Sequence, residues 1–397
     1  MKTFDKKFWI IFIPFIIFIL MVIYFPYWVR DELLFYDFND MGQIGDTFGG
    51  LMGPFIGIAG GILTFLAFWV QYKANEQQKD DLKIQRKREY LSSFETKFFE
   101  LIRLHRENVT DQNYTKFGKT EMEKYQGRKV FRVIHKEFEE CYTEIKRFHK
   151  IYGQSFMRNQ YKNKLKSIIE KNKLNVSEED FALIDLAYTF LFFGVAKDSE
   201  AFLTIKFKQK FNDDYFGKLV TFLQLKPKMQ YGKMYNCWKY FINLNVLEMK
   251  PIFENIHTNR RVSGYEAHLN HMNFFNNLAV EKYYGGHQHR LGHYYRHLFQ
   301  SYKFLFNEND LTDEEKYFFG KTLRAQLSNY EQSLLFLNSL SNLGLKWDLK
   351  PEINPITNKE IRLISEYNII KNVPGIQVLD ITYKKYYPNV EFEFEDN

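Results

Sequence analysis

The amino-acid sequence predicts a mostly α-helical membrane protein. We expect two N-terminal transmembrane helices, a long stalk helix, and an all-α cytoplasmic domain with a small irregular or β C-terminal tail. Two uncharged segments lie within the first 72 residues, and no glycine or proline occurs between Ile62 and Phe117. Beyond that stretch, apolar residues recur at helical spacing. Mean hydropathy is nevertheless −0.42, so most of the chain must be soluble.

The first predicted span covers about residues 8–29, and its 22 residues carry no charge. That length crosses a hydrocarbon core about 30 Å thick. A cleaved signal peptide is the alternative, but its apolar region would be shorter and would end in a small-residue cleavage site. The segment ends instead in Tyr24-Phe25-Pro26-Tyr27-Trp28-Val29, a sequence typical of an aromatic belt at a membrane interface.

The second predicted span, about residues 49–72, has a glycine stripe: Gly45, Gly49, Gly53, Gly57 and Gly61. Small residues at this spacing let two helix backbones approach closely in lipid. The stripe packs either against the first helix of the same chain or along a homo-oligomeric seam, and both arrangements can hold together. Pro54 can kink the helix but is tolerated in a membrane.

Flanking charges predict the orientation of both spans. The loop between them contains Arg30 against five acidic residues, whereas lysines precede the first span and six basic residues lie between Lys73 and Arg88. The positive-inside rule places both termini in the cytoplasm. Abundant Lys, Asn, Ile, Phe and Tyr favour a bacterial source. We therefore expect a multi-pass protein of the bacterial inner membrane.

The predicted organisation has four parts: a membrane segment (1–72), a stalk helix that enters the cytoplasmic domain (73–110), a helical cytoplasmic domain (111–345) and a C-terminal extension (346–397). Residues 73–89 are almost entirely polar and would form a solvated stalk of about 25 Å. Leu91, Phe94, Phe98, Leu101 and Ile102 then return at helical spacing, so this face should be buried.

Helical patterns in the cytoplasmic domain cover 130–152 and lie near 198–211, 214–225, 264–280, 289–308 and 312–343. Ser177, followed by three acidic residues, predicts the N-cap of another helix. That helix is strongly apolar, and we expect it in the core. The last fifty residues contain four prolines and β-favouring stretches such as 376–383. They predict a short helix, a few strands and a frayed acidic tail.

Most familiar chemical motifs are missing from the sequence. Its two cysteines, Cys141 and Cys237, imply neither a disulfide framework nor a cysteine-based zinc site. Gly320-Lys321-Thr322 resembles the end of a phosphate-binding loop, but Glu315 stands where that motif requires glycine. We expect no cofactor and no catalytic residue, and we lean towards a protein that is not an enzyme.

One histidine-rich segment offers two alternatives to that expectation. His289, His293 and His297 would share one helix face, and imidazoles so placed can bind a transition metal. His289 and His293 are the metal candidates, although no carboxylate or cysteine completes the set. Arg290 and His297 have the spacing of the Arg/His pair in HEPN-type ribonucleases, where histidine moves a proton and arginine holds the scissile phosphate. Arg128–His135 and Arg261–His268 share that spacing.

Several short motifs resemble a known family in order and spacing over roughly residues 40–345. They are Gly42-Gln43-Ile44-Gly45-Asp46-Thr47-Phe48-Gly49-Gly50, Pro54, Ala67-Phe68-Trp69-Val70-Gln71, Phe98-Phe99-Glu100-Leu101, Tyr294-Tyr295-Arg296-His297-Leu298-Phe299-Gln300, and Leu323-Arg324-Ala325-Gln326-Leu327-Ser328 with Glu331, Leu334, Leu335 and Asn338. Together they resemble the AbiC-like family of phage abortive infection proteins. Arg296, Arg324, Gln326, Ser328, Glu331 and Asn338 are the polar residues of these motifs. Arg324 and Glu331 would lie two turns apart on one helix face and form a structural polar network rather than an active site.

This resemblance implies bacterial anti-phage defence, in which an inner-membrane effector harms or arrests the infected host. No established catalytic site comes with it. We expect an effector that permeabilises the membrane after sensing infection; the alternatives are a membrane-tethered HEPN-like ribonuclease and a non-toxic scaffold that recruits another toxin. The implied partners are membrane lipid, further copies of the chain, a phage protein or nucleic-acid trigger, and a defence-system partner.

Overall fold

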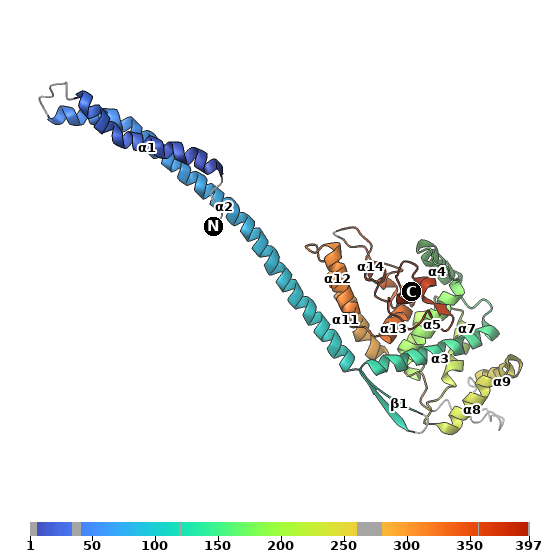
Figure 1. Ribbon diagram of the computed structural model, residues 1–397. Coiled ribbons are helices and arrows are strands. Elements are labelled where there is room, and N and C mark those ends of the chain that lie inside the picture. Colours follow the sequence, from blue (N-terminus) through green and yellow to red (C-terminus); the bar gives the residue numbers. More distant parts are fainter. Residues whose placement is uncertain (1–5, 34–40, 119–120, 260–279, 356, 396–397) are drawn as a thin grey trace. The chain divides into compact units, whose positions relative to one another are not determined.

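The computed structural model describes residues 6–33, 41–118, 121–259, 280–355 and 357–395, which are mostly helical (Figure 1). The chain divides into two compact units, Met1–Thr96 and Lys97–Asn397. The first contains α1 (Lys6–Leu33) and most of α2 (Met41–Thr110). Among the described residues, the second contains the end of α2, the remaining helices and four short strands.

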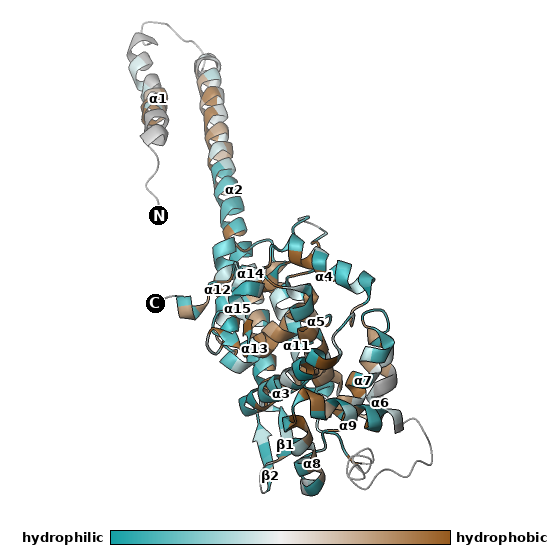
Figure 2. Ribbon diagram, turned by 90° about the vertical axis from the view of Figure 1, so that its right-hand side faces the viewer, coloured by the Kyte–Doolittle hydropathy of each residue, from teal (hydrophilic) through white to brown (hydrophobic). Residues whose placement is uncertain are grey.

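Helix α2 confirms the unbroken helix that the sequence predicts, because it continues for 70 residues and includes Pro54. One stretch of it, Gly45–Thr110, contains a window long and apolar enough to cross a membrane, and α1 contains a shorter apolar stretch, Ile13–Tyr24. Figure 2 shows hydrophobic residues along the earlier part of α2 and hydrophilic residues beyond them. Residues 73–89 are exposed throughout, as expected for a solvated stalk.

The glycine stripe of α2 faces open space among the described residues. A Cβ added at any of the five glycines would meet no atom within 4 Å. Large apolar side chains of the same helix, such as Phe65 (63% exposed) and Phe68 (68% exposed), are also uncovered. The apolar part of α2 therefore has surface that the described part of the chain does not bury.

The second unit is built around α3 (Arg128–Tyr152), α5 (Glu178–Phe193) and α13 (Asn329–Leu340), which pack against one another. Helix α5 also packs against α4 (Asn159–Lys171) and α11 (Gln288–Phe306), and α3 packs against α7 (Asp213–Gln224). The other helices are α6 (Lys197–Phe207), α8 (Gly232–Asn243), α9 (Val246–Asn259), α12 (Asp313–Arg324), α14 (Leu363–Tyr367) and α15 (Tyr383–Tyr386), with 3-10 turns η2 (Leu345–Trp347) and η3 (Glu393–Glu395). The predicted helix at 264–280 lies outside the described residues except at its last position.

Helix α5 is the buried core helix that the sequence predicts. The Ser177 side chain accepts a hydrogen bond from the backbone N–H of Asp180 at 3.0 Å, which confirms the N-cap. Every residue from Phe181 to Phe192 is buried. A helix that is apolar on all sides is stable only when other elements surround it, and α3, α4, α11 and α13 do so.

The single helix predicted at 312–343 is wrong, because the chain forms α12 and α13 there. Ser328 is the N-cap of α13, and a capping box with Glu331 satisfies backbone N–H groups that a new helix leaves free. Arg324 and Glu331 consequently do not share a helix face. Arg324 instead donates to the carbonyls of Tyr367 and Asn368, each at 3.1 Å.

The prediction that residues 111–345 are all helical is also wrong. Strands β1 (Asn113–Phe117) and β2 (Met122–Gln126) form an antiparallel hairpin with Tyr114 opposite Tyr125. Both strands are short and largely polar, so they lack the apolar alternation that marks a strand in sequence. At the other end of the unit, β3 (Gln377–Val378) and β4 (Ile381–Thr382) confirm strands within the 376–383 stretch.

The C-terminal extension is more firmly packed than the sequence suggests. Val390 and Phe392 are completely buried, and Lys384 forms an ion pair with Glu395 at 2.8 Å. The prediction of a frayed tail is therefore wrong for the residues up to Glu395. The last residues of the segment are rich in acidic side chains, but buried apolar residues such as Val390 and Phe392 hold them against the unit.

Candidate functional site

A cavity of about 760 Å³ lies within the second unit along the N-terminal half of α11. Its other walls come from the end of α5, the Gly285–Gly286 segment, Asn338 near the end of α13, and residues 343–347 after it. We call this cavity the α11 cleft. Its volume is in the range of small-molecule sites, about 300–1,000 Å³.

Two glycines position the start of α11 against the end of α5. Gly194 and Gly286 have φ values of +79° and +85°, and a Cβ on either would lie about 2.7 Å from backbone atoms of the other segment. Only glycine adopts such a positive φ without strain and also leaves room for the close approach of the other backbone. The backbone N–H of His287 donates to the carbonyl of Phe192 at 2.8 Å, so the wall of the cleft is fixed by main-chain contacts.

The polar walls of the α11 cleft are basic. His289, His293 and Arg296 follow one another at helical spacing on α11, and Lys346 lies on η2. Burial, followed by the charges of Arg290 and His287, lowers the pKa of His289. None of the described residues that line this cavity is Asp or Glu.

Arg296 and Lys346 differ in how they are engaged. The Arg296 Nε atom donates to the carbonyl of Gly292 at 3.0 Å, and its Nη2 atom lies 3.4 Å from His293 Nδ1. Both contacts stay within α11 and involve no carboxylate. Lys346, in contrast, pairs with Glu352 at 2.8 Å.

The apolar walls of the cleft are mainly aromatic. The Phe299 and Trp347 rings meet edge to face with centroids 5.0 Å apart, and those of Phe192 and Phe193 do so at 4.9 Å. Phe299 is half-buried, whereas Trp347 is 3% exposed. The cleft therefore combines rings that can stack with cations that can bind an anion.

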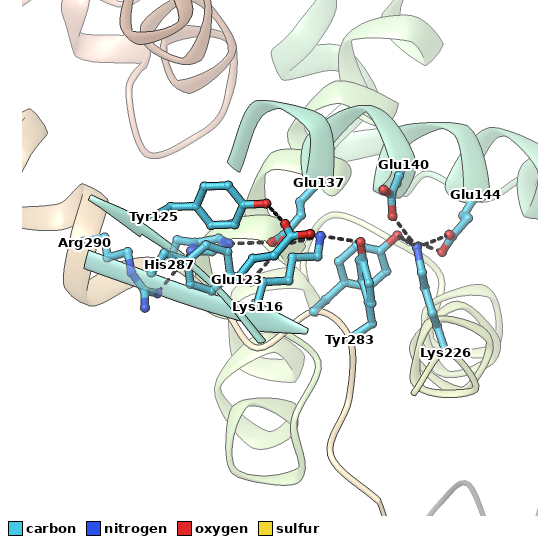
Figure 3. A network of polar contacts seen from close by, with 12 residues as sticks. Lys116, Glu123, Tyr125, Glu137, Glu140, Glu144, Lys226, Tyr283, His287 and Arg290 are labelled. Atoms are coloured by element: carbon cyan, nitrogen blue, oxygen red, sulfur yellow. Dashed lines mark hydrogen bonds and ion pairs between the residues drawn. The ribbon is translucent and has the colours of Figure 1, made fainter. Parts of the chain in front are cut away.

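A network of polar contacts joins α3 to the β1–β2 hairpin and to His287, the residue before α11 (Figure 3). Glu137, Glu140 and Glu144 extend from one face of α3. The Glu137 carboxylate accepts hydrogen bonds from His287 Nε2 at 2.8 Å and from the Tyr114 hydroxyl at 2.7 Å, and Lys116 lies 2.9 Å away. Burial alone would raise the pKa of Glu137, but His287 and Lys116 lower it to about 2.

Lys226 occupies the far end of this network and is 1% exposed. Its Nζ atom lies 2.7 Å from Glu140 and 2.8 Å from Glu144, and 3.7 Å from the centre of the Tyr283 ring. Burial alone would lower the pKa of Lys226, but Glu144 and Glu140 raise it. Paired buried charges of this kind fix the arrangement of elements rather than supply a reactive group.

Arg290 and His297 have different surroundings. Arg290 lines a smaller cavity of about 250 Å³, where Nε donates to the carbonyl of Asn113 at 2.8 Å and the guanidinium lies 4.5 Å from the Tyr114 ring centre. The His297 ring stacks on His105 at 6.2 Å and does not line that cavity. Among described residues, neither ring nitrogen of His297 has a hydrogen-bond partner.

The predicted metal candidates, His289 and His293, do line the α11 cleft together. In the part of the chain that the structure describes, however, no group of three or more His, Cys, Asp or Glu residues could hold a metal ion. The cleft in its described form thus offers cationic and aromatic groups rather than a ligand cage.

The polar residues of the family-like motifs divide between two roles. Arg296 and Asn338 line the cleft, whereas Arg324, Gln326, Ser328 and Glu331 hold helix ends and neighbouring segments. Gln326, for example, accepts from Arg106 Nε at 2.9 Å. Sequence reasoning missed Glu137, His287 and Lys226. The spacing of the three glutamates on α3 was a readable signal, but Lys226 lies 82 residues from Glu144 in the sequence, and His287 lies 150 residues from Glu137.

A family of known proteins is similar to part of this chain. Residues 286–378, which include α11, α12, α13 and several cleft residues, match the model of a family described as "Putative phage abortive infection protein". No curated protein and no solved structure matches the chain. The match at residues 286–378 supports an AbiC-like family of phage abortive infection proteins for this chain.

Proposed function

We propose that this protein is an abortive-infection effector of the bacterial inner membrane that permeabilises the bilayer after infection is sensed. The family match supports the role in phage defence. The apolar stretch of α2 and the shorter one of α1 support membrane attachment. In this proposal both helices span the bilayer, and both termini lie in the cytoplasm because basic residues flank the two spans on that side.

The observation that carries the membrane mechanism is the continuity of α2. One helix without a break contains the apolar stretch, the exposed polar residues 73–89, and Phe98 and Ile102, which are buried. The Phe98 ring packs on Phe319 of α12 with centroids 4.9 Å apart. Because a helix bonds each turn to the next, rotation or displacement at one end can reach the other without a flexible joint.

The glycine stripe is the proposed seam between copies of the chain. Its five glycines face open space among described residues, so a second helix can approach the backbone closely there. Exposed apolar side chains such as Phe65 and Phe68 border the stripe and require lipid or protein contact. Rearrangement of this seam in an oligomer would open a path through the bilayer.

Expression of the full chain and of a Gly53→Leu/Gly57→Leu variant, with phage protection and growth as readouts, tests this proposal. Bulky side chains on the stripe keep the span apolar but block close approach, so protection and growth arrest should be lost. Ile58→Trp is the matched control, because it enlarges an exposed side chain (54% exposed) about 140° around the helix from Gly53. Equal activity of the stripe variant and the control would contradict the proposal.

A further inference from the structure

The α11 cleft combines three features that single out one class of ligand. Its polar wall carries His289, His293, Arg296 and Lys346, and among the residues that the structure describes no carboxylate lines it. Its apolar wall is aromatic. From this combination we propose that the cleft binds a nucleoside phosphate, with the phosphates on the basic wall and the base against the rings.

The basic wall is suited to phosphate because the Arg296 guanidinium has no carboxylate partner among the described residues. Arg296 bonds only to a backbone carbonyl and a histidine of its own helix among the described residues. Its remaining guanidinium N–H groups can form a paired contact with phosphate oxygens, which favour arginine for this geometry. Lys346 is shared with Glu352 and would contribute less.

The backbone at the start of α11 adds to the positive electrostatic potential of the basic wall. This 19-residue helix has no side-chain cap on its first turn and no acidic residue there. Its first N–H groups and the positive end of the helix dipole lie beside His289 in the cleft wall. The backbone contribution alone would not define a ligand, but here it reinforces a wall that is already cationic.

The aromatic wall distinguishes a nucleotide from a simple phosphate ion. Phe299 is half-buried in the wall and is braced edge to face by the Trp347 ring. A braced ring loses little freedom when a planar base stacks on it, so removal of the ring should weaken binding about tenfold or more. The Tyr295 side chain also lines the cleft and is 6% exposed. Its hydroxyl lies near the Tyr188 hydroxyl, but it makes no hydrogen bond of good geometry with the described residues.

The size of the cleft favours a mononucleotide over a nucleic-acid strand. The volume of about 760 Å³ suits one small molecule. Basic residues gather along one wall rather than along an extended groove, whereas a strand requires a groove that follows its backbone. A single nucleoside phosphate can contact the basic wall with its phosphates and the aromatic wall with its base.

Binding is tested on the purified full-length chain in detergent, by fluorescence anisotropy of ribose-labelled ATP and GTP. Unlabelled ATP, GTP, adenosine, inorganic pyrophosphate and a short single-stranded oligonucleotide are the competitors. At least one nucleotide should compete, while adenosine and pyrophosphate, which each occupy one wall, should each compete at least about tenfold more weakly. Arg296→Gln and Phe299→Ala should each weaken nucleotide binding about tenfold or more.

Arg132→Ala removes an exposed arginine on α3 and is the matched control, expected to bind as the parent does. Thermal unfolding of each variant shows that it is folded, and Phe299→Tyr, which keeps the ring, should retain binding if Phe299→Ala loses it through stacking. The proposal is overturned if no nucleotide competes at about 1 mM, if pyrophosphate or the oligonucleotide competes as well as ATP and GTP, or if Arg296→Gln binds as tightly as Arg132→Ala. Because the assay measures binding by the purified chain, its failure would leave the membrane proposal standing.

Discussion

His287 Nε2 donates a hydrogen bond to the Glu137 carboxylate at 2.8 Å, and the two side chains are only 3% and 2% exposed. This contact joins α3 to the residue that precedes α11. The contact therefore fixes one edge of the α11 cleft, although neither Glu137 nor His287 lines that cleft. The same carboxylate holds the β1–β2 hairpin through Tyr114 and Lys116.

Replacement of Glu137 by glutamine should lower the free energy of unfolding by about 3 kcal/mol at pH 7, because a buried charge network loses its anion. The pKa of Glu137 is about 2 in the folded chain, against 4.5 for the free group. A lowered carboxyl pKa stabilises the fold above pH 4.5, and this stabilisation disappears as the pH falls towards 2. Thermal unfolding of the parent and of Glu137→Gln between pH 7 and pH 3 should show that the difference in their stability becomes smaller as the pH falls.

Glu123→Gln is the control for that comparison, because it removes an exposed carboxylate of the hairpin. It should change stability by less than about 0.5 kcal/mol. A Glu137→Gln protein as stable as the Glu123→Gln protein at pH 7 would contradict the role assigned to the contact.

The buried imidazole of His105 should make the protein sensitive to mild acid. Burial, then the charges of His297, Arg128 and Arg106, lowers the pKa of His105 to about 4 from 6.5. The unfolded chain binds the proton first as the pH falls, so the free energy of unfolding should decrease by up to about 1.4 kcal/mol per pH unit between these values. In His105→Phe, stability measured from pH 7 to pH 4.5 should fall less steeply; an unchanged slope would assign the acid sensitivity to another group.

The capping box that separates α12 from α13 should matter more than its surface counterpart. Glu331 is completely buried and also accepts from the Tyr294 hydroxyl at 2.9 Å. Glu331→Ala should therefore cost about 3 kcal/mol. Glu315→Ala, in the capping box of α12, should cost about 1 kcal/mol. Chemical denaturation of both variants measures this difference, and equal losses would rule out a special role for Glu331.

The sequence was most informative where local chemistry determines structure. The N-cap at Ser177 and the unbroken α2 follow from a few neighbouring residues. The split between α12 and α13 was also encoded locally, by Ser328 and Glu331, but the apolar periodicity on either side concealed it. The pattern suited one continuous helix equally well.

The α11 cleft could not be predicted in the same way. Its walls come from segments as far apart as Phe192 and Trp347, and their meeting depends on tertiary packing. His289, His293 and Arg296 were visible as candidates, but the aromatic residues that line the cleft with them were not. Likewise, helical spacing suggested that Arg290 and His297 act together, whereas Arg290 contacts the β1–β2 hairpin and His297 stacks on His105.

An Arg290→Ala/His297→Ala variant should retain growth arrest and phage protection if the chain does not act as a ribonuclease. RNA integrity in induced cells, followed on gels, should be the same for the parent and the variant. Arg128→Ala/His135→Ala, the pair with the same spacing, serves as the comparison. Loss of arrest and of RNA cleavage only in the Arg290/His297 variant, with the protein still folded, would instead support the ribonuclease alternative.

The central claim is that the membrane is the target, and the time course of membrane potential in infected or induced cells tests it most directly. A potential-sensitive dye should report depolarisation before or together with growth arrest, and the Gly53→Leu/Gly57→Leu variant should show neither. Growth arrest in cells that keep their full membrane potential would contradict the account.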